Sequence, residues 1–288
     1  MTLHLTPRPF IVVVTAFFCV AAMPAARAQD ASAWETQPHA AARLIAGAAT
    51  KSASANQLQA GIEIKLAPGW HTYWRYPGDS GVPPTFDFAG SQNIRSVSVL
   101  WPAPQRFADG AGGHSIGYIG EVVLPLRIVP DDPGKPASLH VKLGYAICGN
   151  MCIPGEADLA LTVSGQAGAQ AAAVAAADKR VPRRVPLGAL GALAILAVHR
   201  EAGGTHERVI VDIAAPKDAA VDLFAEGPTP EWALPLPEPA AAGGSAPGVR
   251  RFAFALDGLP QGARAKGAKL MLTAVSPNDA IEVAAPLD

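Results

Sequence analysis

The chain has 288 residues, of which 50% are hydrophobic, 6% aromatic and 16% charged, and its formal net charge is −1. This length suits one large domain or two domains of ordinary size. The net charge is near zero and the sequence contains no block of like charges. Both observations argue against a charged surface for nucleic acid, so no nucleic-acid partner is expected.

Residues 1–28 have the layout of a secretory signal peptide. A weakly basic start precedes the apolar run 10–20, and the small-x-small sequence at 26–28 predicts cleavage before Gln29. The alternative is a membrane anchor, but this run is shorter than the ~20 residues that a span needs. A later apolar run, 187–198, is also too short. We therefore expect an exported, periplasmic protein with no membrane span in the mature chain, whose net charge would be about −3.

The next part of the chain has the period-two pattern of β-strands. Turn-rich segments separate the runs, and one run, 122–129, is interrupted by Pro125, which favours an edge strand or a bulge. Short strands at this spacing predict an antiparallel β-sandwich over residues 29–165. The alternating runs are 61–66, 96–99, 139–147 and 159–163.

A second small β domain is expected after a linker. Residues 166–186 are Ala-rich and then basic, and they predict a short helix or a flexible linker. The second domain would span 187–288 and include a mobile loop at 235–247, which is rich in Pro, Ala and Gly. Without cysteines, it is interpreted as a structural or partner-docking domain. Its expected strands lie at 208–213, 221–225, 251–256, 269–275 and 280–283.

The cysteines carry the chemical signal. Cys19 lies in the signal segment, which leaves Cys148 and Cys152 in an oxidising compartment where a close pair is usually a disulfide. Gly149 and Asn150 both tolerate positive φ, so the three intervening residues suit a hairpin turn. The cysteines would then face each other at a Cα separation of ~4.5–5.5 Å, which a disulfide can span.

The strand alternation also predicts where the two sulfurs point. Cys148 is in phase with Gly144 and Ala146, and Cys152 is in phase with Glu156 if the strand register is not shifted. We therefore expect both sulfurs on the polar outer face, where small neighbours leave room for an attacking thiolate.

Three interpretations of the pair remain open. A structural staple is common in exported proteins, yet closing a five-residue ring is worth only about 2 kcal/mol on the loop-entropy formula. A short, exposed cross-strand disulfide is of the exchangeable type, so a redox pair is slightly favoured. Cys148, Met151 and Cys152 are also soft ligands that suit Cu(I), but His71 and His114 could join them only through the fold. No cofactor and no metal site are predicted.

Several motifs together resemble a known family. They are PGWHTYWRYPGDSGVPP at 68–84, WPAP at 101–104, IGY at 116–118 and YAICGNMCIP at 145–154. Residues 35–165 resemble the N-terminal periplasmic domain of the thiol:disulfide interchange protein DsbD, in the branch of the copper-tolerance protein ScsB.

The resemblance implies an immunoglobulin-like sandwich with a redox-active pair at Cys148 and Cys152. It implies thiol–disulfide interchange of the protein-disulfide reductase type, with reducing equivalents carried to or from periplasmic thioredoxin-like proteins. By analogy, Cys152 forms the mixed disulfide and Cys148 resolves it. Familiar full-length members continue into a membrane domain and a thioredoxin domain. This sequence ends at Asp288 without them, so a separate membrane electron carrier of the DsbD/CcdA type is the expected donor.

The competing interpretation is a non-enzymatic β-sandwich whose structural disulfide serves partner binding or copper tolerance. Among the other motif residues, Trp70, Tyr73 and Trp74 are expected to pack in the core or at its rim, with the alternative that one of them covers the disulfide. His71 and Arg75 are expected at the surface or in a turn, where they could tune a thiol.

Overall fold

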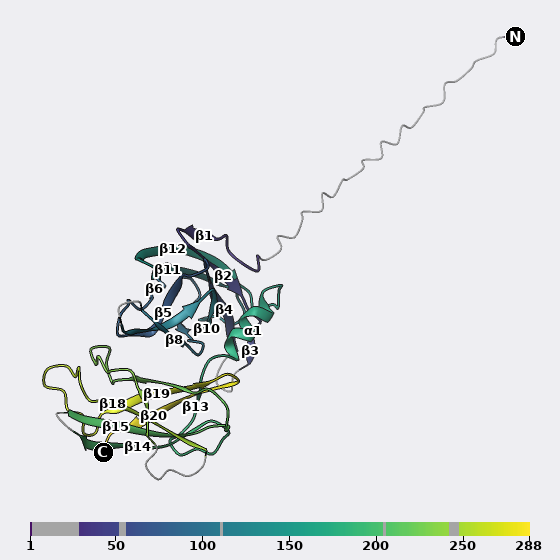
Figure 1. Ribbon diagram of the computed structural model, residues 1–288. Coiled ribbons are helices and arrows are strands. Elements are labelled where there is room, and N and C mark those ends of the chain that lie inside the picture. The colour runs from purple at the N-terminus through teal and green to yellow at the C-terminus, as the bar shows by residue number, and fades with distance from the viewer. Residues whose placement is uncertain (2–28, 52–55, 110–111, 204–205, 242–247) are drawn as a thin grey trace.

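The computed structural model describes residue 1 and residues 29–51, 56–109, 112–203, 206–241 and 248–288. The predicted signal peptide and its cleavage site therefore lie outside the described residues, apart from Met1 and the residues that follow the site. The described chain is an immunoglobulin-like all-β fold followed by a second β domain, as the sequence predicted. Figure 1 shows the two sandwiches one above the other, with the earlier half of the chain in the upper one.

The first sandwich is built from two sheets that face each other. One sheet has the order β1-β2-β4-β10-β7, with β3 beside β4. Its strands are β1 (Glu35–Gln37), β2 (Ala40–Ala46), β3 (Thr50–Lys51), β4 (Asn56–Leu66), β7 (Ser96–Val99) and β10 (Glu121–Val129). The other has the order β12-β11-β5-β9-β8, with β6 beside β11. Its strands are β5 (His71–Gly78), β6 (Thr85–Asp87), β8 (Gln105–Ala108), β9 (His114–Ile119), β11 (Ala137–Cys148) and β12 (Cys152–Val163).

The alternating sequence explains the core of this sandwich. Ile62 and Ile64 of β4 and Leu139 and Val141 of β11 are fully buried in one cluster. Their polar neighbours mostly face outward, but Glu63 is only 4% exposed because Arg43 of β2 lies beside it and donates a hydrogen bond to its carboxylate.

Pro125 lies in an internal strand rather than at the predicted sheet edge. β10 is hydrogen-bonded to β4 on one side and to β7 on the other. However, β7 pairs with β10 only from Leu126 onward, and the carbonyl of Pro125 accepts a hydrogen bond from Leu100 beyond the end of β7. A strand residue directs its nitrogen and its carbonyl to the same side, so the missing N–H of Pro125 falls where the ladder has ended.

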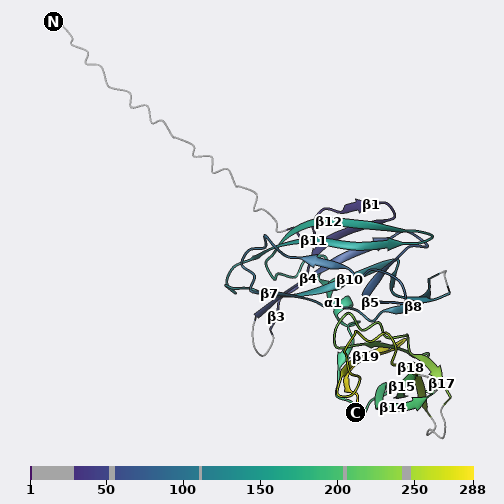
Figure 2. The same ribbon diagram turned by 90° about the vertical axis from the view of Figure 1, so that its left-hand side faces the viewer.

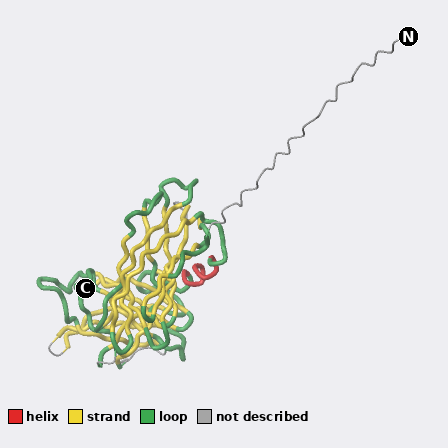
Figure 3. The backbone as a smooth tube through the Cα atoms, turned by 90° about the horizontal axis from the view of Figure 1, so that it is seen from above, coloured by secondary structure: helices red, strands yellow, loops and turns green. Residues whose placement is uncertain are grey.

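The Ala-rich segment forms the helix α1 (Ala171–Asp178), which was one of the two predicted outcomes. Its residues Val174 and Ala177 are buried. Gly47 leaves part of the space into which the Val174 side chain fits, since a Cβ there would come within 3.0 Å of it. The helix therefore packs on the first sandwich, and Figure 3 shows it at the margin of the strands.

The second sandwich has two four-stranded sheets, with orders β13-β20-β19-β16 and β14-β15-β18-β17. Its core cluster is separate and includes Val209, Val211 and Leu272. The first sheet comprises β13 (Arg183–Arg184), β16 (Asp222–Glu226), β19 (Lys269–Ser276) and β20 (Asp279–Pro286), and the second comprises β14 (Ala194–Gly203), β15 (His206–Ala214), β17 (Glu238–Ala240) and β18 (Val249–Ala255).

The two sandwiches meet along the side that carries β5 and β8, as Figures 1 and 2 both show. Phe224 of β16 and Leu236 belong to the hydrophobic cluster of the first sandwich, although they come from the second half of the chain. The ring of Phe224 lies 5.8 Å from that of Trp74 on β5. The described residues contain no helix with the length and hydropathy of a membrane span.

Candidate functional site

Cys148 and Cys152 form a disulfide at the turn of the β11–β12 hairpin. The two residues are direct cross-strand partners with a Cα separation of 4.1 Å. The ladder continues without a shift from this pair to Ala137 and Val163, so the Pro154-Gly155 sequence does not change the register. Within the turn, the amide of Gly149 donates to the carbonyl of Met151. The predicted hairpin disulfide is therefore confirmed.

The two sulfurs are not equally accessible, which corrects one prediction. Cys152 is exposed, as expected, but Cys148 is only 1% exposed. The reason lies in the sheet order: Cys148 pairs with His71 of β5 on its second side, while β12 is the end strand of its sheet. Strand alternation shows the face of a residue but not which neighbouring strand covers it.

Tyr73 covers the buried sulfur. Its hydroxyl donates to Cys148 Sγ at 3.1 Å and lies 3.6 Å from Cys152 Sγ; a disulfide has no hydrogen to give, so the phenol is the donor in both contacts. The side chain is 3% exposed. Burial raises the pKa of the phenol above its usual value of 10.0, so Tyr73 keeps its proton at neutral pH.

The cover over Tyr73 depends on Gly81. This residue has φ +127°, which is rare for other residue types, and a Cβ there would overlap the Tyr73 ring. The segment that follows β5 therefore lies directly against the ring. Of the aromatic residues that the sequence placed in the core or rim, Tyr73 is thus the one that contacts the disulfide.

Other rings complete the wall beside the hairpin turn. His71 lies 4.4 Å from Phe107 of β8 and edge-on to Tyr73 at 5.4 Å. Burial lowers the pKa of His71 below 6.5, so this half-buried imidazole is neutral at pH 7. Trp70 stacks on His39 at 4.0 Å, and its indole lies close enough to Gly149 to leave little room for a Cβ.

The exposed residue Cys152 lies beside an apolar surface. Val82 and Met151 are 61% and 65% exposed, which is unusual for large hydrophobic residues. Val82 and Cys152 line one groove of about 370 Å³, together with Pro83 and Ile153. Cys152 is therefore available to another molecule that brings apolar surface with it.

Comparisons with known proteins agree with this geometry. Residues 41–164 match the family model of the thiol:disulfide interchange protein DsbD, N-terminal. This part of the chain is a DsbD N-terminal-like domain. It contains the disulfide hairpin, Tyr73 and Gly81, whereas the second sandwich lies outside the match.

Solved structures extend the comparison to the second sandwich. The N-terminal periplasmic domain of ScsB from Proteus mirabilis aligns with a TM-score of 0.68 at 23% identity, covering 90% of this chain and 98% of that chain. The shared fold therefore includes both sandwiches. The C-terminal domain of the AgI/II polypeptide BspA from Streptococcus agalactiae covers 83% of this chain and 93% of that chain at 10% identity, but with a TM-score of 0.14. A search of curated protein sequences gives no match.

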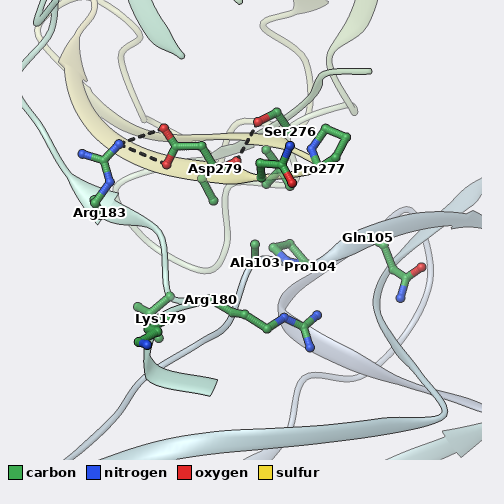
Figure 4. Close-up of a pocket in the computed structure, with 13 residues that line it drawn as sticks. Ala103, Pro104, Gln105, Lys179, Arg180, Arg183, Ser276, Pro277 and Asp279 are labelled. Atoms are coloured by element: carbon green, nitrogen blue, oxygen red, sulfur yellow. Dashed lines mark hydrogen bonds and ion pairs between the residues drawn. The ribbon is translucent and has the colours of Figure 1, made fainter. Parts of the chain in front are cut away.

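A second pocket, of about 380 Å³, has no lining residue from the β11–β12 hairpin. It lies between the β19–β20 turn and the segment after α1. Figure 4 shows Ser276 and Asp279 on one wall and Lys179 and Arg180 on the other. Arg183 donates to both carboxylate oxygens of Asp279, at 3.0 and 2.9 Å. The lining contains no cysteine, so it offers no thiol chemistry.

The structure corrects the expected position of Arg75. Arg75 lies in strand β5 and makes ion pairs with the second sandwich rather than standing in a turn. Among the described residues, no three His, Cys, Asp or Glu side chains are grouped as metal ligands would be. Gly81 lies in the motif at 68–84 but was not among the predicted site residues, although the Asp-Ser-Gly sequence after a strand is a turn signal that marks it.

Proposed function

We propose that this protein is a periplasmic thiol–disulfide exchange carrier that acts through Cys148 and Cys152. The observation that carries the proposal is the unequal exposure of the two cysteines: Cys148 is 1% exposed, whereas Cys152 is an exposed residue that lines a groove. An exchange reaction needs one sulfur that a partner can reach and a second that stays close enough to complete the reaction. The hairpin provides both.

The proposed reaction has two steps. In the reduced protein, the Cys152 thiolate attacks a partner disulfide, which forms a mixed disulfide and releases one partner thiolate. The Cys148 thiolate then attacks Cys152 Sγ, which re-forms the intramolecular disulfide and releases the second partner thiolate. One partner disulfide is reduced to a dithiol as the protein's dithiol is oxidised, and the protons follow the thiolates.

The local residues support these two roles. The Tyr73 hydroxyl, 3.1 Å from Cys148 Sγ, can donate to the thiolate that Cys148 becomes, and a hydrogen bond to a charged acceptor is stronger than one to a neutral acceptor. The same hydroxyl lies farther from Cys152 Sγ, at 3.6 Å, so it restrains that sulfur less, and Cys152 borders the apolar groove. Cys152 is thus the sulfur we assign to the mixed disulfide.

The family match and the fold guide the choice of partners. We propose periplasmic thioredoxin-like proteins as clients and a membrane electron carrier of the DsbD/CcdA type as the donor. The solved structure with the shared fold is a periplasmic domain, which supports export through the predicted signal peptide. The proposed division is 29–165 for the redox domain, 166–186 for the linker and 187–288 for the second domain.

The experiment is a redox titration of the mature protein in glutathione buffers. Exchange function requires a potential within the range of known relay proteins, roughly −120 to −270 mV. A potential below roughly −300 mV would indicate a static structural disulfide instead.

Single-cysteine variants test the assignment of roles. With oxidised glutathione as the probe, Cys148→Ser should form a stable mixed disulfide at Cys152. The matched variant Cys152→Ser should form it far more slowly, because its remaining sulfur lies under Tyr73. Equal trapping by both variants would refute the assignment. The copper interpretation predicts a stoichiometric Cu(I) complex that is lost in Cys148→Ser.

A further inference from the structure

Strand β5 loses its neighbour immediately after Tyr73. Its pairing with β9 runs from His71 to Tyr73 and resumes only at Gly78. The four residues in between therefore have no cross-strand partner in β9. A strand segment without a ladder is free to shift unless other contacts hold it, and Tyr73, which covers Cys148, stands at its start.

The second sandwich contacts this segment residue by residue. The ring of Trp74 lies 5.8 Å from that of Phe224. The hydroxyl of Tyr76 donates to the carbonyl of Leu234 at 2.6 Å. Arg75, between them, makes the ion pairs noted above. Three consecutive residues of β5 are thus each held by the second domain where the sheet does not hold them.

Arg75 is the strongest of these connections. Its guanidinium donates to both carboxylate oxygens of Glu226, at 2.9 and 2.7 Å, and to Glu282 at 2.8 Å. Burial alone lowers the pKa of Arg75, but the hydrogen bonds and charges of Glu226 and Glu282 outweigh it and raise the pKa. Glu282 is only 5% exposed and also accepts from Arg184. A forked, partly buried pair of this kind fixes position as well as charge.

Strand β8 is held in the same way. The side chain of Arg106 is 13% exposed and donates to Asp222, to Glu238 and to the carbonyl of Leu223. The next residue, Phe107, packs on His71 beside the disulfide. Each strand that supplies a ring to the wall is therefore bound by an arginine to the second domain.

We propose that the second domain is a brace that holds the Tyr73 hydroxyl on Cys148 and thereby sets the disulfide–dithiol equilibrium. Arg75 and Arg106 are its positioning residues. In the reduced state, the hydroxyl stabilises the Cys148 thiolate, so the brace favours the dithiol. The brace gives the second domain a role in the proposed function, and it rests on the Tyr73–Cys148 contact and on the ion pairs of Arg75 and Arg106 with the second domain.

The test measures that equilibrium in the whole mature chain with dithiothreitol. The reaction converts the protein disulfide and reduced dithiothreitol into the protein dithiol and oxidised dithiothreitol, and alkylation followed by mass spectrometry counts the free thiols. Arg75→Gln should shift the equilibrium toward the disulfide by about threefold to tenfold, the size of a weakened hydrogen bond to a charged group.

A matched control separates position from general stability. Arg251 makes a forked pair with Asp212 at 2.8 and 2.9 Å, within the second domain, and its side chain is 19% exposed. Arg251→Gln removes a comparable ion pair without touching β5 and should leave the equilibrium unchanged. An equal shift in the two variants, or none in Arg75→Gln, would overturn the proposal.

A double-mutant cycle identifies the route of the effect. If the brace acts through the hydroxyl, Arg75→Gln should have no further effect in a Tyr73→Phe background. Full additivity would overturn that route. Should Arg75→Gln fail to fold, Glu226→Gln weakens the same clamp while Glu282 remains, and it should shift the equilibrium in the same direction. The two proposals can fail separately. If Arg75→Gln shifts the dithiothreitol equilibrium but Cys148→Ser forms no mixed disulfide with oxidised glutathione, the exchange function is refuted and the brace is not.

Discussion

The hairpins β11–β12 and β19–β20 are built alike but closed differently. In the second sandwich, Ser276 pairs with Asp279 across a two-residue turn, and the serine hydroxyl donates to the aspartate carbonyl at 3.0 Å. In the first sandwich, the disulfide between Cys148 and Cys152 stands in the corresponding place. Both ladders run through their full length without a shift, so a tight hairpin in this molecule does not need a covalent bond to close it.

The residues that surround the two hairpin turns also differ. The cysteine hairpin is bordered by the exposed apolar side chains of Val82 and Met151. The turn of β19–β20 lies instead in a pocket with Lys179, Arg180 and Arg183. An exposed apolar border costs solubility and is usually kept for contact with another molecule. This difference supports the proposal that the disulfide serves exchange more than it serves closure of the hairpin.

The largest expected effect is a difference in reactivity between the two thiols. The free thiol of Cys148→Ser should react with 5,5′-dithiobis(2-nitrobenzoate) on the order of a hundred times faster than that of Cys152→Ser, because reaction requires access to the sulfur. Absorbance of the released thiolate measures both rates. In urea the two rates should converge; a persistent difference there would mean that folding is not its cause.

Removing the bond should have a moderate effect on stability. The double variant Cys148→Ser, Cys152→Ser should lose about 2 kcal/mol of unfolding free energy, as expected for a five-residue ring. Urea unfolding followed by circular dichroism measures the loss. A loss above about 4 kcal/mol would place the disulfide among structural staples and reverse the comparison.

Removing the Ser276 hydrogen bond should destabilise the protein less than removing the disulfide. Ser276→Ala removes the partly buried bond to the Asp279 carbonyl and should cost about 1 kcal/mol. Ser138→Ala, at an exposed position of β11, is the control and should cost less than about 0.5 kcal/mol. Similar losses in the two variants would show that the serine does not close the turn.

The smallest effect concerns pH. Burial lowers the pKa of His71 in the folded state, so below pH 6.5 the unfolded chain binds more protons and stability falls as the pH falls. His140 acts in the opposite sense: hydrogen bonds to Ala89 and Asp158 raise its pKa, so its contribution is lost as the pH rises above 6.5. His71→Gln should therefore flatten only the acidic limb, measured by urea unfolding at pH 5.5, 6.5 and 7.5. An unchanged acidic limb would contradict this.

The local pattern predicted what depends on neighbours in sequence. The alternation in 139–147, the Gly149-Asn150 turn and the close cysteines were enough for the hairpin and for the exposure of Cys152. The burial of Cys148 was not predictable in this way, because it depends on β5 pairing with β11 across more than seventy residues of chain. Arg75 was misplaced for a similar reason: its partners Glu226 and Glu282 lie in another domain.

Two elements of the second sandwich show the same limit. The segment 235–247 was expected to be a mobile loop, yet β17 (Glu238–Ala240) lies within it and pairs with β18 at the edge of a sheet. Proline is tolerated on an edge strand, so Pro239 does not prevent the pairing. Residues 242–247 lie outside the described residues. β14 (Ala194–Gly203) also went unpredicted, since its apolar run 194–198 lacks a clean alternation.

The contribution of Phe224 to the first core has a consequence for how the molecule melts. Trp74 and Phe224 are both fully buried, and separating the two halves would expose both rings to water. That exposure costs free energy in proportion to the apolar area uncovered. Heating should therefore give a single calorimetric endotherm for the whole chain: in its unfolding, a molecule with two hydrophobic interiors behaves as one cooperative unit.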